Sequence, residues 1–388
     1  MSGVGAPGGR GGVADTADVV VVGSGIVGLG AAYAAVRRGL RVIVVDRTDG
    51  PIGATVRNFG HLCIGAQAGE ARRYADVSRE LWLRLARDAG FWLRESGTLV
   101  AARHTDEIAV LEEAAADGGI RMLDADELLR LAPLRAEGLL GGAHIETDLQ
   151  TDPRTAAAAI VRHLAALGVE FRFRTAVTSV TGGRVATTRG TIDADAVVVA
   201  VNHDLDQLLP EIAERVGVVR CALDMMRAAV TLEHPLPAPL LTGWSLVRYG
   251  RFADSASAAV LRERLHTERP DLAALDLNQM YTQLPDGTLI IGDSHATAIA
   301  PAPFQPEAAF AAFLAEAQVL FDMPAPRVLE RWQGVYAKGP QDFLVERGDE
   351  GVLVLAATTG IGMTTGLGLA EENLAAAFGW APAMEGTS

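Results

Sequence analysis

The 388-residue chain is poor in several residue types, and each shortage excludes a class of protein. Its two cysteines, Cys63 and Cys221, are too few for a disulfide framework and cannot by themselves form a tetrahedral zinc site. No apolar run approaches the roughly 20 residues of a membrane helix, and the N-terminus lacks the hydrophobic core of a signal peptide. We therefore predict a cytoplasmic protein with no metal site and no membrane contact.

Positive charge is scarce as well. The chain has 34 Lys and Arg residues against 48 Asp and Glu residues, and its net charge of −14 argues against a nucleic-acid partner, because phosphate binding needs clustered cations. Lys338 is the only lysine, and the other basic residues are arginines. Apolar residues, by contrast, make up 49% of the chain, which is enough for a large core, and the length suggests two domains.

The N-terminal region has the pattern of a βαβ unit with a dinucleotide-binding turn. Apolar runs over residues 18–22 and 41–45 flank a helical segment that ends near Arg38, as in a buried parallel sheet. The turn after the first run contains Gly23, Ser24, Gly25, Ile26, Val27 and Gly28. Gly23 allows a tight turn, Gly25 lets backbone amides approach a diphosphate, and Gly28 lets the helix pack on the sheet. The alternative is a Gly-rich turn in an ordinary α/β sheet.

Asp46, which is followed by Arg47, ends the second apolar run. A carboxylate at this place can accept hydrogen bonds from both hydroxyls of an adenosine ribose. The pair therefore extends the predicted dinucleotide site to the next strand.

Later segments extend this unit and interrupt it. Further apolar strands are expected at 195–200 and 351–356, whereas 223–300 has spaced β segments around a polar helix near 255–266. The predicted fold class is α/β, with a Rossmann-like dinucleotide domain and a discontinuous second substrate domain on a mixed or antiparallel sheet. The expected ranges are a flexible lead-in 1–17, a dinucleotide domain 18–88, 145–222 and 327–380, a substrate domain 89–144 and 223–326, and a tail 381–388.

The C-terminal segment favours FAD over NAD as the dinucleotide. A Gly/Thr loop over 358–365 precedes a helix expected over 366–378. Amides of a helix N-terminus could face the O2 and N1 edge of a flavin, which carries negative charge when reduced, unlike nicotinamide. The residues concerned are Gly360, Gly362, Met363 and Thr364. A loose Gly-rich connection is the alternative.

The chain resembles the FAD-dependent amine and amino-acid oxidases of the D-amino-acid oxidase, glycine oxidase and sarcosine oxidase superfamily. The resemblance is carried by 19–28 with Asp46, the block around 190–201, the segment 332–334 and the segment 359–363. Segments 56–61 and 224–227 are similar to a bacterial branch associated with aminophosphonate catabolism. The resemblance implies non-covalent FAD, held also by Arg57, Asn58, Gly60, His61 and Val177.

His61 is the strongest active-site candidate that the resemblance implies. An imidazole beside the flavin could hydrogen-bond flavin or substrate, and it titrates near neutral pH. Some relatives attach flavin through a late cysteine, but no cysteine follows Cys221, which excludes that link. A histidyl link at His61 stays open, as does the interpretation of His61 as a buried histidine without a chemical role.

The segment Trp332-Gln333-Gly334-Val335-Tyr336-Ala337-Lys338 departs from the family pattern. Glycine oxidase-like relatives usually have an arginine two residues after this Gly, where it binds the substrate carboxylate with two parallel hydrogen bonds. This chain has Tyr336 there. Lys338 offers a point charge instead, which suits a tetrahedral phosphonate as well as a carboxylate, or it is a surface lysine without a role.

The predicted reaction is FAD-dependent oxidation of a small acidic primary or secondary amine, namely an aminoalkylphosphonate, an N-methylated glycine or a simple amino acid. Hydride transfer to flavin N5 would give an imine that water hydrolyses to a carbonyl, with O2 or another electron acceptor as the second substrate. Further residues expected to contact substrate are Arg227, Tyr249, Tyr281 and His295. The alternatives are a hydroxy-acid oxidoreductase and a non-catalytic flavoprotein subunit, and the oligomeric state stays open.

Overall fold

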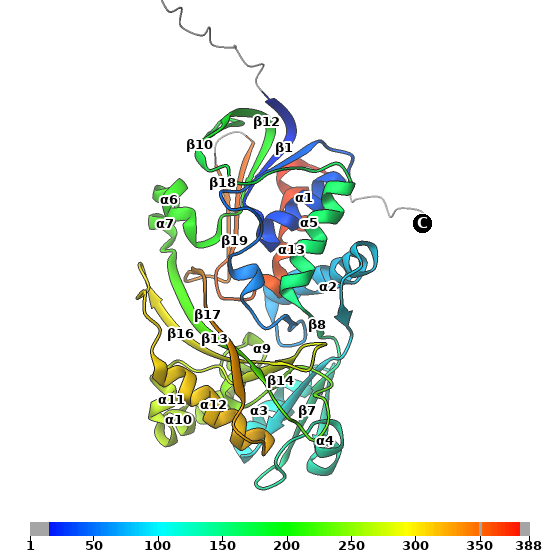
Figure 1. Cartoon of the computed structure of the whole chain (residues 1–388), viewed down its shortest axis with the longest axis vertical. Helices are drawn as coiled ribbons and strands as arrows, with labels where there is room; N and C mark the ends of the chain where they lie inside the picture. Colours follow the sequence, from blue (N-terminus) through cyan, green and yellow to red (C-terminus); the bar gives the residue numbers. More distant parts are fainter. Residues whose placement is uncertain (1–14, 349–350, 381–388) are drawn as a thin grey trace, which may run out of the picture.

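Two eight-stranded sheets dominate the structure, a computed structural model in which residues 15–348 and 351–380 are described. Figure 1 shows one sheet with its helices in the upper half of the molecule and the other sheet in the lower half. A small third sheet joins β3 (His61–Leu62), β8 (Leu149–Thr151) and β4 (Leu93–Arg94). The sequence therefore folds into the expected α/β class with a second, largely antiparallel sheet.

The first sheet has the order β10-β11-β12-β1-β2-β9, with β19 paired to β12 and β18 paired to β19. Its strands are β1 (Asp15–Val22), β2 (Val42–Val45), β9 (Glu170–Arg172), β10 (Val177–Thr181), β11 (Arg184–Thr187), β12 (Gly190–Val199), β18 (Phe343–Arg347) and β19 (Val352–Ala357). The central strands β9, β2, β1, β12 and β19 run parallel. Every residue of β2 and β19 is buried, as expected for strands covered on both faces.

The second sheet has the order β17-β13-β16-β15-β14-β5-β7-β6. Its strands are β5 (Thr98–Ala102), β6 (Ile120–Asp124), β7 (Gly141–Ile145), β13 (Val219–Ala229), β14 (Leu240–Leu241), β15 (Met280–Gln283), β16 (Leu289–Ala298) and β17 (Arg327–Lys338). All neighbours are antiparallel except β14 and β5, which run parallel. The segment 327–338, expected in the dinucleotide domain, thus pairs with β13 in this sheet.

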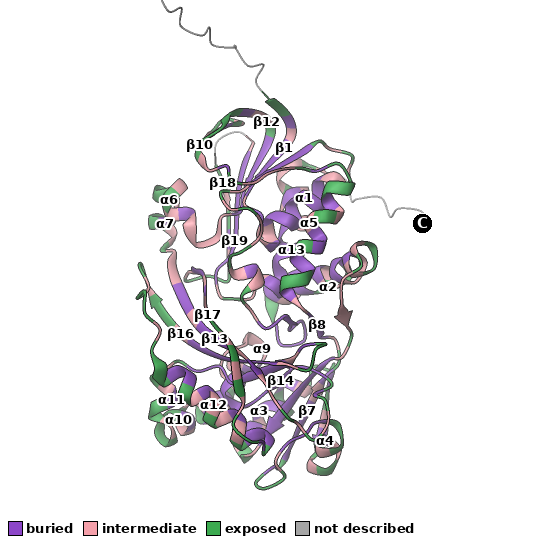
Figure 2. Ribbon diagram, in the orientation of Figure 1, coloured by how far each residue is buried: buried purple, intermediate pink, exposed green. Residues whose placement is uncertain are grey.

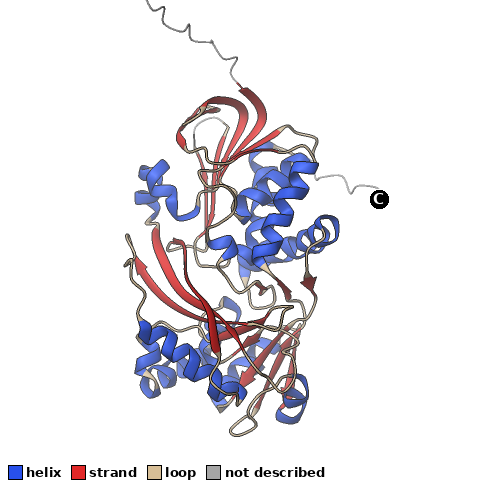
Figure 3. Ribbon diagram, in the orientation of Figure 1, coloured by secondary structure: helices blue, strands red, loops and turns tan. Residues whose placement is uncertain are grey.

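Helices cover the outer faces of both sheets (Figure 3). Those beside the first sheet are α1 (Ile26–Val36), α2 (Gly69–Ala89), α5 (Pro153–Ala166), α6 (Leu205–Leu208), α7 (Pro210–Val216) and α13 (Gly362–Phe378). Those beside the second sheet are α3 (Thr105–Ala115), α4 (Ala125–Leu131), α8 (Gly243–Leu246), α9 (Gly250–Ala253), α10 (Ala256–Glu268), α11 (Pro270–Ala273) and α12 (Glu307–Phe321). Two 3-10 turns, η1 (Ala54–Val56) and η2 (Asn202–Asp204), lie near the junction. None of the described helices is long and apolar enough to cross a membrane.

The buried residues of Figure 2 form separate cores around each sheet. Between α1 and α13, the guanidinium groups of Arg37 and Arg38 each pair with Glu371, at 2.8 and 2.7 Å. The expected lead-in is shorter than 1–17, because residues 15–17 already belong to β1 and pair with 192–194 of β12. The rest of the lead-in and the expected tail 381–388 lie outside the described residues.

Candidate active site

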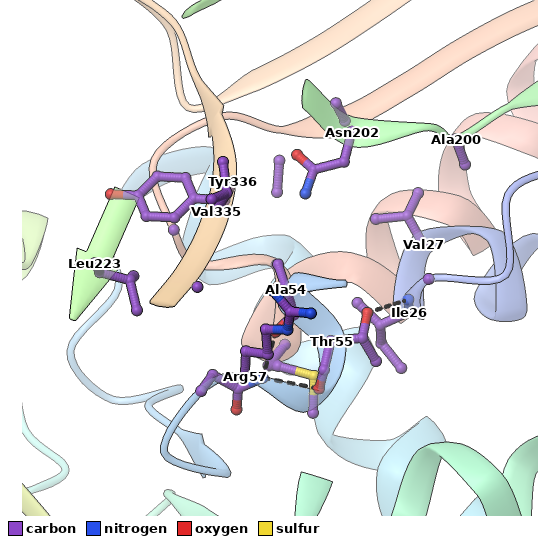
Figure 4. Close-up of a pocket in the computed structure, with 18 of the residues that line it drawn as sticks. Ile26, Val27, Ala54, Thr55, Arg57, Ala200, Asn202, Leu223, Val335 and Tyr336 are labelled. Atoms are coloured by element: carbon purple, nitrogen blue, oxygen red, sulfur yellow. Dashed lines mark hydrogen bonds between the residues drawn. The ribbon is translucent and has the colours of Figure 1, made fainter. Parts of the chain in front are cut away.

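Three adjoining cavities form one elongated cleft at the junction of the two large sheets. A cavity of about 400 Å³ lies over the ends of β1 and β2, and a narrow one of about 100 Å³ connects it to a wide cavity of about 750 Å³ against the second sheet. The first two share Gly25 and Arg57, and the last two share Asn58 and Tyr336. Figure 4 shows Ile26 and Val27 at one end of the connecting passage, with Leu223 and Tyr336 at the other.

The turn between β1 and α1 requires glycine for steric reasons. Gly23 has a φ of +104°, and a Cβ atom there would lie 2.5 Å from the carbonyl oxygen of Ala200. A Cβ atom at Gly28 would lie 2.0 Å from the carbonyl oxygen of Gly23, so the helix packs directly on the turn. At the start of α1, the amide of Ile26 donates to Thr55 Oγ1 at 2.9 Å. The helix N-terminus therefore opens into the cleft, where its amides can bind an anion.

Ser24, in this turn, and Thr48 both donate hydrogen bonds to the carboxylate of Asp46. Asp46 Oδ2 accepts hydrogen bonds from the amide and hydroxyl of Ser24, at 2.7 and 2.6 Å. Oδ1 accepts from the amide and hydroxyl of Thr48, at 2.9 and 2.7 Å. The carboxylate lines the 400 Å³ cavity as predicted, but its oxygens already hold protein donors. A ribose hydroxyl would have to share them, which sequence patterns do not reveal.

Other predicted cofactor residues differ in how they meet the cleft. Arg47 lines the 400 Å³ cavity and forms an ion pair with Asp204, and Val177 lines the same cavity. Arg57 lines the connecting passage and donates to the carbonyl of Gln333 at 3.1 Å. Asn58 lines the passage too, while its side-chain amide donates to the carbonyls of Ala54 and Thr55 and stabilises η1. Gly60 does not line any of the three cavities. Its positive φ allows the backbone to turn at this position.

His61 lines the wide cavity, and two buried side chains fix its imidazole ring. Its Nε2 atom lies 2.6 Å from Thr98 Oγ1 and 3.2 Å from Asp148 Oδ2, and Asp148 is fully buried. Because Thr98 donates its own hydroxyl hydrogen to Asp148 Oδ2, at 2.7 Å, the hydrogen between His61 and these groups belongs on Nε2. Nδ1 is then a buried acceptor, and it has no hydrogen-bond partner among residues 15–348 and 351–380. Sequence reasoning missed Asp148.

The N-terminus of α13 forms another wall of the wide cavity. The helix begins at Gly362, four residues before the expected start, so Met363 and Thr364 belong to its first turn and line the cavity. Their amides lie in the turn that has no intrahelical acceptor. Just before it, Gly360 lines the cavity, and the buried hydroxyl of Thr359 has no hydrogen-bond partner in the part of the chain that the structure describes.

Cys63 lies beside this helix end. Its amide donates to Thr364 Oγ1 at 3.1 Å, and burial raises the pKa of its thiol to about 12. The thiol is therefore protonated at neutral pH and a poor nucleophile.

Charged side chains gather at the far end of the wide cavity, against the second sheet. Of the residues predicted to contact substrate, Tyr249, His295, Tyr336 and Lys338 line it. So do several residues that sequence reasoning missed, namely Arg248, Asp276, Asn278 and Asp293. Burial would raise the pKa of Asp276, but the charge and hydrogen bond of Arg248, with a contribution from Lys338, bring it below its usual value.

Two predicted substrate residues lie away from the cavity. Tyr281 is buried in the core of the second sheet, where its hydroxyl accepts a hydrogen bond from Gln279 and its ring packs edge-on against Phe321. Arg227 points to the sheet edge, where it binds Thr288 at 2.8 Å and pairs with Asp286. Neither residue lines the cavity, so neither is assigned to substrate binding. The sequence placed both on strands but did not reveal to which side of the sheet each side chain points.

A Rossmann-like sheet, a glycine turn at a helix N-terminus and a cleft that continues onto a second sheet define the two-domain dinucleotide oxidoreductases. The chain belongs to the family "DAO: FAD dependent oxidoreductase", whose model matches residues 18–376.

Two curated relatives are similar over part of their length. The chain is 27% identical over 198 residues to glycine oxidase from Bacillus licheniformis, which covers 47% of this chain and 53% of that protein. It is 30% identical over 280 residues to D-amino acid dehydrogenase from Cereibacter sphaeroides, which covers 62% of this chain and 64% of that protein. The chain thus spans about half the length of the glycine oxidase that it matches.

Solved structures share the fold over nearly the whole chain. L-proline dehydrogenase from P. horikoshii superposes with a TM-score of 0.77 at 18% identity, covering 96% of both chains. Glycine oxidase from Bacillus cereus ATCC 14579 gives a TM-score of 0.75 at 17% identity, covering 94% of this chain and 96% of that one.

The cleft fits the cofactor of this family. Three buried polar atoms that lack a partner among the residues the structure describes belong to the wide cavity: His61 Nδ1, Asp293 Oδ1 and Thr359 Oγ1. Buried polar atoms in native proteins are nearly always hydrogen-bonded, so these atoms indicate that a polar ligand completes the site. At the other end, the close approach at Gly23 and Gly28 leaves the N-terminus of α1 open for a diphosphate.

Proposed function

We propose that this protein uses FAD to oxidise the C–N bond of a small amine that also carries an acidic group. When bound, FAD supplies a hydride acceptor and a place for two electrons. The first turn of α1 would hold its diphosphate, and Asp46 its ribose. The first turn of α13, with Thr359, would face the flavin ring in the wide cavity.

The hydrogen bonding of Arg248 is the observation that supports an acidic group on the substrate. Only its Nη1 atom is engaged, with the carbonyl of Asp276 at 3.1 Å and with Oδ1 of the same residue at 2.7 Å. Among the described residues, no hydrogen bond uses its Nε or Nη2 atom. This guanidinium edge can bind an acid group with two parallel hydrogen bonds, as the arginine that Tyr336 replaces would do.

Lys338, the last residue of β17, adds a second positive charge to the same cavity. A fork and a point charge together suit a tetrahedral phosphonate, which has three oxygens to satisfy, as well as a carboxylate. We therefore place aminoalkylphosphonates, such as 2-aminoethylphosphonate and its N-alkyl forms, first among the substrates, before N-methylated glycine and simple amino acids.

The chain's own residues would position the substrate rather than attack it. With the acid group at Arg248 and Lys338, the amine-bearing carbon lies between these cations and the wall formed by His61 and α13. Fixing both partners in a reactive geometry removes much of the entropic barrier. Water would then hydrolyse the resulting imine to a carbonyl compound.

An anaerobic substrate screen tests this function. Purified holoenzyme is mixed with aminophosphonates, amino acids or hydroxy acids, and the visible absorption band of the flavin is followed. Bleaching by an amine that carries an acid group is the expected result. Bleaching by hydroxy acids alone would overturn the proposal in favour of a hydroxy-acid oxidoreductase, and a stable yellow protein that no compound bleaches would indicate a non-catalytic flavoprotein subunit.

A further inference from the structure

Asp293 is a buried carboxylate with one oxygen that no protein group satisfies. It lies on β16, is only 5% exposed, and lines the wide cavity. Within the described part of the chain, its Oδ1 atom has no hydrogen-bond partner. The backbone of Asp293 is fixed, because its amide donates to the carbonyl of Asn278 at 2.7 Å and its carbonyl accepts from the amide of Asn278 at 2.8 Å. A buried acceptor without a donor is costly, so this oxygen points to a donor on a ligand.

His295 adds a second acceptor beside this carboxylate. Its Nδ1 atom lies 3.0 Å from the carbonyl oxygen of Asp276, and a carbonyl can only accept, so Nδ1 carries the hydrogen. Burial, and after it the charge of Arg248, lower the pKa of His295 to about 3, which keeps the ring neutral. Nε2 is then an acceptor, and it lies 3.6 Å from Asp293 Oδ2. Among the described residues, no hydrogen bond engages either Asp293 Oδ1 or His295 Nε2, so two acceptors stay open to a ligand in the cavity.

The cations of the cavity do not fill this gap. Arg248 forms its ion pair with Asp276, and in the described part of the chain no ion pair joins Asp293 to Arg248 or Lys338. Burial raises the pKa of Asp293 to about 7, although the charge of Arg248 opposes the shift. The carboxyl group is therefore close to half ionised at neutral pH.

We propose that Asp293 and His295 bind the amino group of the substrate, and that Asp293 accepts the proton that a substrate ammonium must lose before oxidation. An ammonium group has N–H donors that match Oδ1 and Oδ2 of Asp293 and Nε2 of His295. This inference rests on the proposed function. It assigns the amino group of the substrate to the same cluster of side chains in which Arg248 and Lys338 are assigned its acid group.

The proton balance of this step is simple. One N–H bond of the ammonium breaks, an O–H bond forms on Asp293, and the nitrogen keeps the electron pair. That pair can then form the C=N bond while the hydride leaves the adjacent carbon for the bound FAD. Asp293 returns the proton to water after the product leaves. A base whose pKa lies near neutral is well suited to this exchange.

Four titratable groups that lie close to Asp293 keep one protonation state near neutral pH. Burial raises the pKa of the Tyr249 and Tyr336 hydroxyls, which therefore stay protonated. Asp276, with its lowered pKa, stays ionised, and His295 stays neutral. The basic side chains of Arg248 and Lys338 are the other charged neighbours in this part of the cavity. A change in amine affinity between about pH 6 and about pH 8 that Asp293→Asn removes would therefore report on Asp293.

Binding of a matched pair of unreactive probes to the holoenzyme tests the proposal. 2-Aminoisobutyrate has no hydrogen on the carbon that bears its nitrogen, so it binds without being oxidised, and isobutyrate is the same acid without the amine. Calorimetry should show that the affinity for 2-aminoisobutyrate rises about tenfold from about pH 6 to about pH 8, because Asp293 ionises and attracts the ammonium. The affinity for isobutyrate should stay level or fall, because the new negative charge repels it.

Asp293→Asn should remove this rise and weaken 2-aminoisobutyrate about tenfold or more at the higher pH. Asp254→Asn is the matched control, because it removes one exposed carboxylate of the same cavity and should keep the wild-type profile. FAD content, read from the visible band, checks that each variant is folded.

The proposal is overturned if both probes show the same pH dependence in the wild type, a result that needs no variant. It is also overturned if folded Asp293→Asn keeps the wild-type profile. Should the probe bind too weakly, the same pH comparison is made on the amine that bleaches the flavin, from the concentration dependence of bleaching. A screen in which no amine bleaches the flavin contradicts the proposed function itself, whereas bleaching without the pH dependence contradicts only the role of Asp293.

Discussion

Lys338 offers the most direct test of the acid-binding end of the cavity. Its substitution by Met removes one of two cationic side chains that line the cavity, so we expect acidic amines to bind about tenfold more weakly. FAD content should not change, because Lys338 does not line the two cavities assigned to the diphosphate and ribose. Dissociation constants and the flavin-to-protein absorbance ratio measure the two effects.

Lys338→Arg is the control for this substitution, since it keeps the charge and should retain most of the affinity. If Lys338→Met binds acidic amines as tightly as the wild type, the residue has no part in substrate binding. Arg248 would then have to provide the whole acid site.

At the residue scale, the sequence revealed the site only in part. His61 and Lys338 could be singled out, one through a family resemblance and the other because it is the only lysine. Asp276 and Asp293 could not, because neither belongs to a motif. Asp276 meets Arg248 across 28 residues of sequence, and Asp293 is held beside this segment by backbone hydrogen bonds to Asn278. The properties that make Asp293 a candidate base, its burial and its unsatisfied oxygen, exist only in the folded chain.

At the scale of single elements, the junction of β1 with α1 is the feature most sensitive to one added methyl group. Gly28→Ala would place Cβ 2.0 Å from the carbonyl oxygen of Gly23, so the helix must move away from the turn. We expect this variant to lose FAD and to unfold at lower temperature. Gly50→Ala is the matched control, because a Cβ there meets no atom within 4 Å. Retention of full FAD content by Gly28→Ala would contradict the assigned diphosphate site.

For single strands and helices, the apolar pattern of the sequence predicted some elements and missed others. Apolar runs gave β1, β2 and β19, since strands buried on both faces need a continuous apolar sequence. The assignment of β17 failed, because its burial alternates along the strand and nothing local says which sheet it joins. The early start of α13 was missed because Gly362 and the threonines after it are weak helix formers that contacts with Cys63 and Trp82 hold in place.

At the scale of the whole molecule, the cleft exists because the two sheets meet along β13 and β17. Ala337 near the end of β17 donates its amide to Asn202 Oδ1 at 2.8 Å, which ties the second sheet to the turn after β12. Residues from both sheets line the passage, including Leu355 from the first and Tyr336 from the second. A ligand that fills the whole cleft therefore contacts both halves of the protein.

This arrangement predicts how the cofactor affects stability. FAD binds the native state and not the unfolded chain, so at a concentration about a thousandfold above its dissociation constant it adds about 4 kcal/mol to the free energy of unfolding. Thermal unfolding of the apoprotein should therefore occur several degrees below that of the holoprotein. ADP, at the same concentration, can contact only the cavities beside β1 and β2 and should raise Tm less than FAD does. Equal effects of ADP and FAD would mean that the flavin ring makes no contact with the wide cavity, and the placement of the reaction there would fail with it.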